Sequence, residues 1–149
     1  MNDFASDPTT GWRLWAMLSA GFAALTAIFA KIGVSGIDSD LATFFRTLVI
    51  IVALAAILAW TGKFSATPAI SGKSMIFLVL SGLATGASWL CYFRALKLGD
   101  ASRVAPIDKL SVVLVAVFGV LFLGERLSAP NWLGVALIGG GAILVAWRN

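Results

Sequence analysis

Five long apolar stretches constrain what this chain of 149 residues can fold into. Each is close to the ~20 residues with which an α-helix crosses the ~30 Å hydrocarbon core of a bilayer. Short connectors containing glycine, proline, serine or aspartate separate them. We therefore predict an all-α integral membrane protein whose single domain, residues 1–149, holds five transmembrane helices. Their expected ranges are roughly 12–32, 41–60, 75–98, 105–124 and 131–147.

The composition agrees with a membrane protein. Hydrophobic residues make up 60% of the chain and charged residues 12%, whereas a soluble domain has about 45–50% and about 25%. This leaves too little polar surface to cover an exterior that faces water. The five stretches also leave no segment for a separate soluble domain.

The residue types that are missing exclude several functional classes. The chain has no histidine, and Cys91 is its only cysteine. Catalytic Ser-His-Asp and Cys-His groups, and Cys/His zinc sites within one chain, therefore cannot form. We expect no enzyme activity, no cofactor and no metal. The formal net charge of +4 comes from basic residues scattered between apolar runs, so nucleic acid is not an expected partner.

The distribution of basic residues leaves the membrane orientation open. An odd number of spans puts residues 12 and 147 on opposite faces, with four Lys and Arg on the first face and seven on the other. Arg46, Arg94 and Lys109, within the expected helices, are candidates for a functional instead of a topological role, and without these three of the seven the count is four against four. One interpretation is dual topology in a bacterial inner membrane. The other is a single orientation with the seven-charge face in the cytoplasm.

Arg46 is the strongest candidate for a functional side chain, because ionisable groups within a membrane are costly and usually functional. It lies about 9 Å into the helix expected over 41–60. Thr43 and Thr47 lie beside it, so the three residues form a polar sector in an apolar helix. Such a sector is expected to face the bundle interior or a wet cavity. The alternative is that Arg46 extends to the nearby interface.

Two other basic residues lie close to helix ends. Lys31 and Arg94 are each within two turns of a helix terminus, where they can reach lipid headgroups or compensate the helix dipole. Their alternative role is substrate binding. Ser39 or Asp40 is expected to cap the helix over 41–60.

The start of the fourth helix carries a proline and two charges. Pro106 suits the first helical position, and Asp108 in the first turn suits the dipole. The uninterrupted apolar run over 110–123 covers only about 21 Å. The helix must therefore draw Asp108 and Lys109 towards the hydrocarbon, or stop short and leave a hydrated notch. Either case places a carboxylate and an ammonium beside Arg46 and Arg94 on the same side of the membrane, where the four charges could form a vestibule.

Aromatic and glycine residues form the remaining candidate surfaces. Trp89 and Phe93 are four residues apart, which predicts either the wall of a slot for an organic substrate or ordinary packing. Gly82 and Gly86 precede them on the same helix and allow close helix approach. The last helix has a stronger small-residue surface, expected to mark a helix–helix or subunit contact: Gly134, Gly139, Gly140 and Gly141.

Several motifs in the second half of the chain occur in a fixed order. Residues 92–99 read YFRALKLG, a Gly-Glu-Arg turn lies at 124–126, and residues 133–138 read LGVALI. With Lys31 closing the first helix and Arg46 early in the second, this pattern resembles the EamA family of the drug/metabolite transporter superfamily. Most members resemble two such units fused into ten helices, with substrate handled between inverted halves. The resemblance implies that this single unit forms an antiparallel homodimer, or a heterodimer with a second half-size protein.

The resemblance also separates the chain from a related group. Small multidrug resistance proteins share the turn and the glycines, but they have four helices and a membrane-embedded Glu in the first. The helix over 12–32 contains no Glu, so proton-coupled multidrug antiport is not expected. Family members move amino acids, sugars, nucleosides and other metabolites, and membership does not name a substrate.

The predicted function is a secondary transporter, expected to be an exporter, of a small polar or amphipathic metabolite by alternating access in an inverted dimer. Arg46, with Lys31, Arg94 or Lys109, would attract an anionic group, and Trp89 and Phe93 would pack on an apolar part. Two alternatives are a flippase subunit for a lipid-linked substrate and a non-transporting scaffold or regulatory subunit. The full expected substrate-binding set is Lys31, Thr43, Arg46, Trp89, Phe93, Arg94, Asp108 and Lys109.

Overall fold

The computed structural model describes residues 8–64 and 70–147 as an all-α protein. Five of its helical segments are long and apolar enough to cross a membrane, and α4 and α5 together form one of them. The predicted fold class is therefore confirmed. The helices are α1 (Pro8–Gly33), α2 (Ser39–Trp60), α3 (Gly72–Leu98), α4 (Ala101–Asp108), α5 (Ser111–Leu123) and α6 (Ala129–Ala146).

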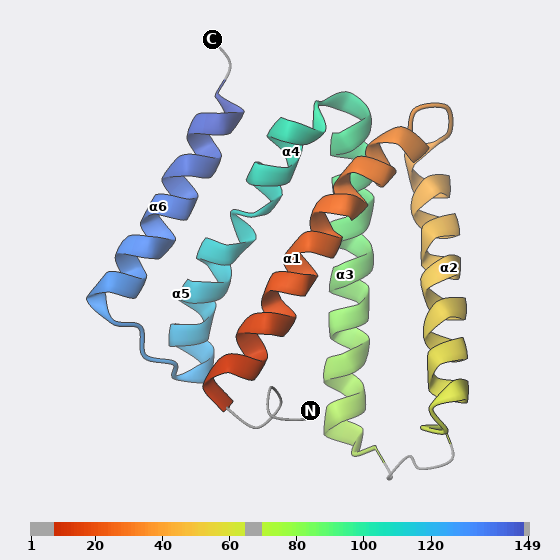
Figure 1. Ribbon diagram of the computed structural model, residues 1–149, viewed down its shortest axis with the longest axis horizontal. Helices are drawn as coiled ribbons and strands as arrows, with labels where there is room; N and C mark the ends of the chain where they lie inside the picture. The colour runs from red at the N-terminus through yellow and green to blue at the C-terminus, as the bar shows by residue number, and fades with distance from the viewer. Residues whose placement is uncertain (1–7, 65–69, 148–149) are drawn as a thin grey trace.

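The spans run up and down between two ends of the bundle (Figure 1). α1 and α2 both pack against α3, α4 packs against α1 and α3, and α6 packs against α4 and α5. The α1–α2 and α3–α4 connections lie at one end, which we call the α1–α2 end (Figure 1). The N-terminus of α1 and the α5–α6 connection lie at the opposite end.

The buried core is small and lies towards the α1–α2 end. It consists of residues from α1, α2 and α3 together with Val34, and Leu96 and Val34 are 0% and 1% exposed. Large apolar side chains elsewhere on the helices are mostly exposed. This exposure suits a membrane protein, because lipid tails solvate apolar side chains while helices satisfy their own backbone. The core members are Ala30, Val34, Ala42, Phe93 and Leu96.

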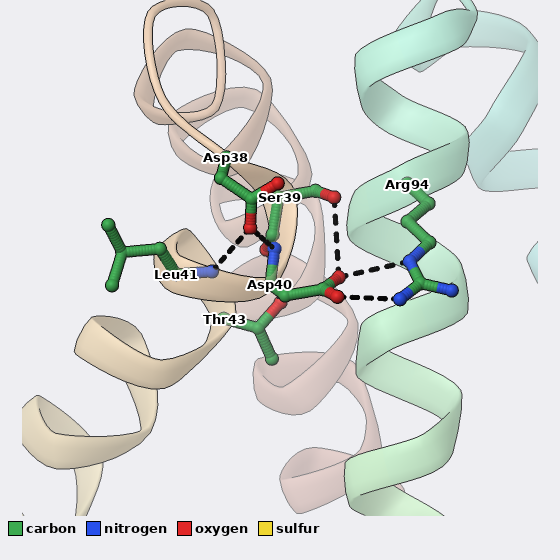
Figure 2. Close-up of polar contacts among 6 residues, drawn as sticks. All are labelled: Asp38, Ser39, Asp40, Leu41, Thr43 and Arg94. Atoms are coloured by element: carbon green, nitrogen blue, oxygen red, sulfur yellow. Dashed lines mark hydrogen bonds and ion pairs between the residues drawn. The ribbon is translucent and has the colours of Figure 1, made fainter.

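α2 begins two residues earlier than the sequence predicted, and its cap differs. The Asp38 carboxylate accepts hydrogen bonds from the backbone N–H groups of Asp40 (2.9 Å) and Leu41 (3.1 Å). The expectation that Ser39 or Asp40 would cap this helix was therefore wrong. Because Asp38 satisfies the free N–H groups, the Asp40 carboxylate can point across to α3 (Figure 2).

The fourth span is broken, where the sequence predicted one helix over 105–124. α4 begins four residues earlier, so Pro106 lies inside it rather than at its first position. A proline there removes one backbone hydrogen bond and crowds the preceding turn. The Leu110 N–H then donates to Ile107 O (2.9 Å), three residues back, and α5 starts only afterwards. The remaining 13 residues of α5 cover about 20 Å, so this helix is too short to cross the ~30 Å hydrocarbon core by itself.

Candidate functional site

A cavity of about 1100 Å³ lies between α1, α3 and the broken fourth span. It is as large as the largest common ligand pockets, which range over about 300–1,000 Å³. One wall is α1, which contributes mainly alanines and small hydroxyl side chains, and α3 contributes Ser88, Trp89 and Tyr92. Residues around the α4–α5 break form the wall opposite, and Arg46 reaches the cavity from α2.

The Arg46 side chain lies against two aromatic rings of α3. Its guanidinium carbon is 4.0 Å from the centroid of the Trp89 ring and 5.6 Å from that of Phe93. Both contacts are within the ~6 Å at which a cation is attracted to a ring face. Within residues 8–64 and 70–147, Arg46 takes part in no ion pair and no side-chain hydrogen bond. The five N–H donors of its guanidinium are therefore available to another molecule.

Asp108 and Lys109 line the same cavity at the helix break. Lys109 Nζ lies 3.2 Å from Asp108 Oδ2, so these two charges offset each other. The positive charge that remains in the cavity is that of Arg46. The structure thus brings four of the predicted site residues together from three spans: Arg46, Trp89, Asp108 and Lys109.

Lys31 lies elsewhere, at the end of α1. Its ammonium donates hydrogen bonds to the backbone oxygens of Leu96 (2.6 Å) and Gly99 (2.8 Å). Carbonyls at the end of a helix lack partners within the helix, so Lys31 caps α3 from a neighbouring span. It does not line the large cavity.

Arg94 does not line the large cavity either, and it has a carboxylate partner. It pairs with Asp40 through two hydrogen bonds, Nε to Oδ1 (3.0 Å) and Nη2 to Oδ2 (2.6 Å), which join α3 to α2 (Figure 2). One turn further, Lys97 Nζ donates to Ile37 O (2.9 Å), a contact that the sequence did not predict. We call Lys31, Arg94 and Lys97 the basic latch, because together they tie the three spans at the α1–α2 end.

Two other predicted site residues, Thr43 and Phe93, do not line the large cavity. The Thr43 hydroxyl is buried and donates to Ser39 O (2.8 Å), and Thr47 donates to Thr43 O (2.8 Å), so both hydroxyls are satisfied within α2. Phe93 is in the core and lines a second pocket of about 340 Å³ between α1 and α2. Arg46 lines both hollows.

The wall that α1 contributes was not predicted. Its small residues Ala16, Ala20, Ala23 and Ala27 recur every three or four positions and all line the large cavity. That spacing places them on one helix face, so the periodicity of small residues was the signal that could have identified this wall.

The predicted glycine surfaces differ in their surroundings. A Cβ atom on Gly139 would lie 3.1 Å from Val113 Cγ2, at the contact of α6 with α5. For the others, no atom of the described residues lies within 4 Å of a Cβ position. A partner subunit could therefore approach them closely. These open glycines are Gly82, Gly86, Gly134, Gly140 and Gly141.

Comparison with known proteins matches the EamA-like transporter family to residues 10–147. One relative, from a Sinorhizobium species, is named as an uncharacterized transporter in the cobO 3′ region. It is 65% identical over 91% of this chain and 96% of its own length.

More distant relatives match a shorter region. A Yersinia pestis protein named as a probable 4-amino-4-deoxy-L-arabinose-phosphoundecaprenol flippase subunit, ArnE, is 32% identical over 48% of this chain and 63% of its own length. An uncharacterized Methanocaldococcus jannaschii protein is 30% identical over 52% of this chain and 56% of its own. No solved structure gives a significant match.

Proposed function

Because the chain belongs to the EamA-like transporter family, we propose that it is a secondary transporter, an exporter, of a small polar or amphipathic metabolite that carries an anionic group. The observation that supports this proposal is the position of Arg46. Its guanidinium borders a cavity of about 1100 Å³, lies 4.0 Å from the Trp89 ring centroid and has no carboxylate partner in the described part of the chain.

Arg46 suits the recognition of an anion for physical reasons. A guanidinium presents paired N–H donors that match a carboxylate or phosphate in two parallel hydrogen bonds. Keeping such a cation unpaired within a membrane is costly unless water or a substrate solvates it. The Trp89 ring lies against the guanidinium and would offer an apolar surface to the rest of the substrate. The site would therefore select a molecule with one charged and one apolar part.

Transport by this unit would require a second unit. We include in the proposal an inverted dimer in the bacterial inner membrane, formed by two copies of the chain or by one copy and a second half-size protein. Five spans, the balanced distribution of basic residues and the open glycines Gly134, Gly140 and Gly141 on α6 support it. In alternating access, the Arg46 cavity would then open first to one face of the membrane and afterwards to the other.

Membrane orientation tests the dimer directly. A cysteine appended after Asn149, in a Cys91→Ala background, can be labelled with a membrane-impermeant maleimide on intact cells. Dual topology predicts that about half of the chains are labelled before lysis. Labelling of all chains or of none contradicts an inverted homodimer and directs the search to a partner protein of opposite topology.

Export of organic anions tests the function. Cells that produce wild-type protein, Arg46→Ala or Arg103→Ala are compared for organic anions released into the medium, measured by mass spectrometry. Arg103 is an exposed basic residue of α4 that lines neither cavity, so its variant controls for the loss of one charge. We expect export to be lost only in Arg46→Ala, with membrane insertion unchanged. Normal export by that variant would reduce Arg46 to an interfacial anchor.

A second candidate is a flippase subunit for a lipid-linked substrate. It is favoured by the relative named as a probable flippase subunit, which is 32% identical over about half of this chain. Activity that depends on a lipid-linked substrate would favour this candidate over a transporter of free metabolites. Stable association with another membrane protein without movement of any solute would favour a scaffold instead.

A further inference from the structure

The second pocket, between α1 and α2, has a more apolar lining than the large cavity. It has a volume of about 340 Å³, lies between α1 and α2 towards the α1–α2 end, and has only Thr26 and Arg46 as polar lining residues. The large cavity, in contrast, contains Asp108, Lys109 and several hydroxyl groups. Thr26 and Arg46 line both, so the apolar pocket and the polar cavity are adjacent at these two side chains.

Arg46 thus marks the boundary between a polar and an apolar compartment. Its guanidinium lies over Trp89, which lines the large cavity, and within 5.6 Å of the ring centroid of Phe93, which lines the small pocket. An anion bound to Arg46 would have any polar part directed into the large cavity. An apolar part that extends the other way would enter the pocket without losing hydrogen bonds.

We infer that the pocket between α1 and α2 is a subsite for the hydrocarbon portion of the substrate, and that the substrate class is an anionic amphiphile with its charge between a polar and an apolar part. This inference rests on the proposed function. A polar group in the pocket would lose its hydrogen bonds to water and regain few, which is unfavourable. The volume corresponds to roughly ten atoms at ~30 Å³ each, enough for a short alkyl chain or a ring.

The pocket also communicates with the surface of the bundle. Phe29 of α1 and Phe45 of α2 line it, and both side chains are more than half exposed. In a membrane this surface faces lipid, so a longer chain can continue into the bilayer between α1 and α2. The occupant we assign is the substrate's own apolar chain, held in place by the bond of its anionic group to Arg46.

Gly33 offers a way to fill the pocket without disturbing its walls. It lines the pocket at the end of α1, and no described atom lies within 4 Å of its Cβ position. The Cβ atom of a Gly33→Leu variant therefore meets no described atom, and the larger side chain is added at a residue that lines the pocket. Gly21→Leu is the matched control, because Gly21 is also on α1, has the same free surroundings and lines neither hollow.

The test is the affinity of the full-length protein for monoalkyl phosphates from ethyl to octyl. Binding is measured by isothermal titration in zwitterionic lipid nanodiscs, with empty nanodiscs subtracted. Each methylene that enters the pocket is expected to raise the wild-type affinity about fourfold, until the pocket is full. Gly33→Leu is expected to abolish this gain, whereas Gly21→Leu keeps it.

The outcomes separate this inference from the function on which it rests. A chain-length gain that persists in Gly33→Leu, or that is missing from the wild type, overturns the subsite and leaves the anion site intact. Ethyl phosphate binding that is absent from the wild type, or equal in wild type and Arg46→Ala, overturns the anion site itself. Folding of each variant is checked by its helical circular dichroism and its elution volume.

Discussion

Basic side chains occur in two settings in this protein, and the contrast between them is informative. At the α1–α2 end, each member of the basic latch has an acceptor on another segment: backbone oxygens for Lys31 and Lys97, and the Asp40 carboxylate for Arg94. About two turns along α2 from that end, Arg46 lies against two ring faces and has no ion-pair partner among the described residues. The partners of a cation, more than its depth, distinguish a structural charge from one available to a substrate.

The strongest test of this comparison uses two variants of Arg46, one that removes its charge and one that keeps the charge but changes the geometry of the donors. We expect Arg46→Ala to lower ethyl phosphate affinity by about 30-fold or more, because truncating one partner of a buried charge pair costs about 2–5 kcal/mol. Arg46→Lys keeps a point charge but loses the paired donors of the guanidinium and its contact with the Trp89 ring. Its affinity should lie between those of the other two proteins, as measured by titration in nanodiscs. An Arg46→Lys variant that binds as well as the wild type would show that charge alone suffices.

The latch should show the opposite pattern. Lys31→Met keeps most of the side-chain volume but leaves the Leu96 and Gly99 carbonyls without their charged donor. Hydrogen bonds to charged groups contribute about 1.5–3 kcal/mol, so we expect a loss of stability of that order, measured by unfolding in detergent. Lys73→Met, at the opposite end of α3, should change stability little. Ethyl phosphate affinity should be retained by both variants; its loss in Lys31→Met alone would place Lys31 in the site.

The smallest effect is expected at the Arg94–Asp40 pair. Its side chains are 60% and 45% exposed, and exposed ion pairs contribute little because solvent screens them. A double-mutant cycle with Arg94→Ala and Asp40→Asn should give a coupling smaller than the effect of Lys31→Met, and one that falls as salt rises. A coupling as large as the Lys31 effect would indicate that this pair is shielded from water.

Much of the fold could be predicted from the sequence, because apolar length alone determines where a chain can cross a membrane. The Gly-Glu-Arg turn was also informative: Gly124 ends α5 with φ +69°, a conformation that favours glycine. The break after Asp108 could not be predicted from composition. Pro106 suits either the first turn or the interior of a short helix, and its position depends on how far α4 extends back to Ala101.

The candidate site could be predicted only in part, for reasons of geometry. The sequence indicated that Arg46, Trp89, Asp108 and Lys109 are unusual, but their meeting at one cavity depends on how three helices are rotated. The acceptors of Lys31 are backbone oxygens 65 and 68 positions away. Backbone oxygens carry no sequence signal, so Lys31 could not be separated from a substrate-binding residue before the structure was known.

The one-sided position of the basic latch has a consequence for symmetry. If two copies insert in opposite orientations, as we propose, their latches lie at opposite faces of the membrane, and each copy ties its three spans together at a different face. Two copies with the same conformation would then have both latches formed, or both broken, at the same moment. Opening only one face of the proposed dimer would therefore require the two identical chains to differ in conformation.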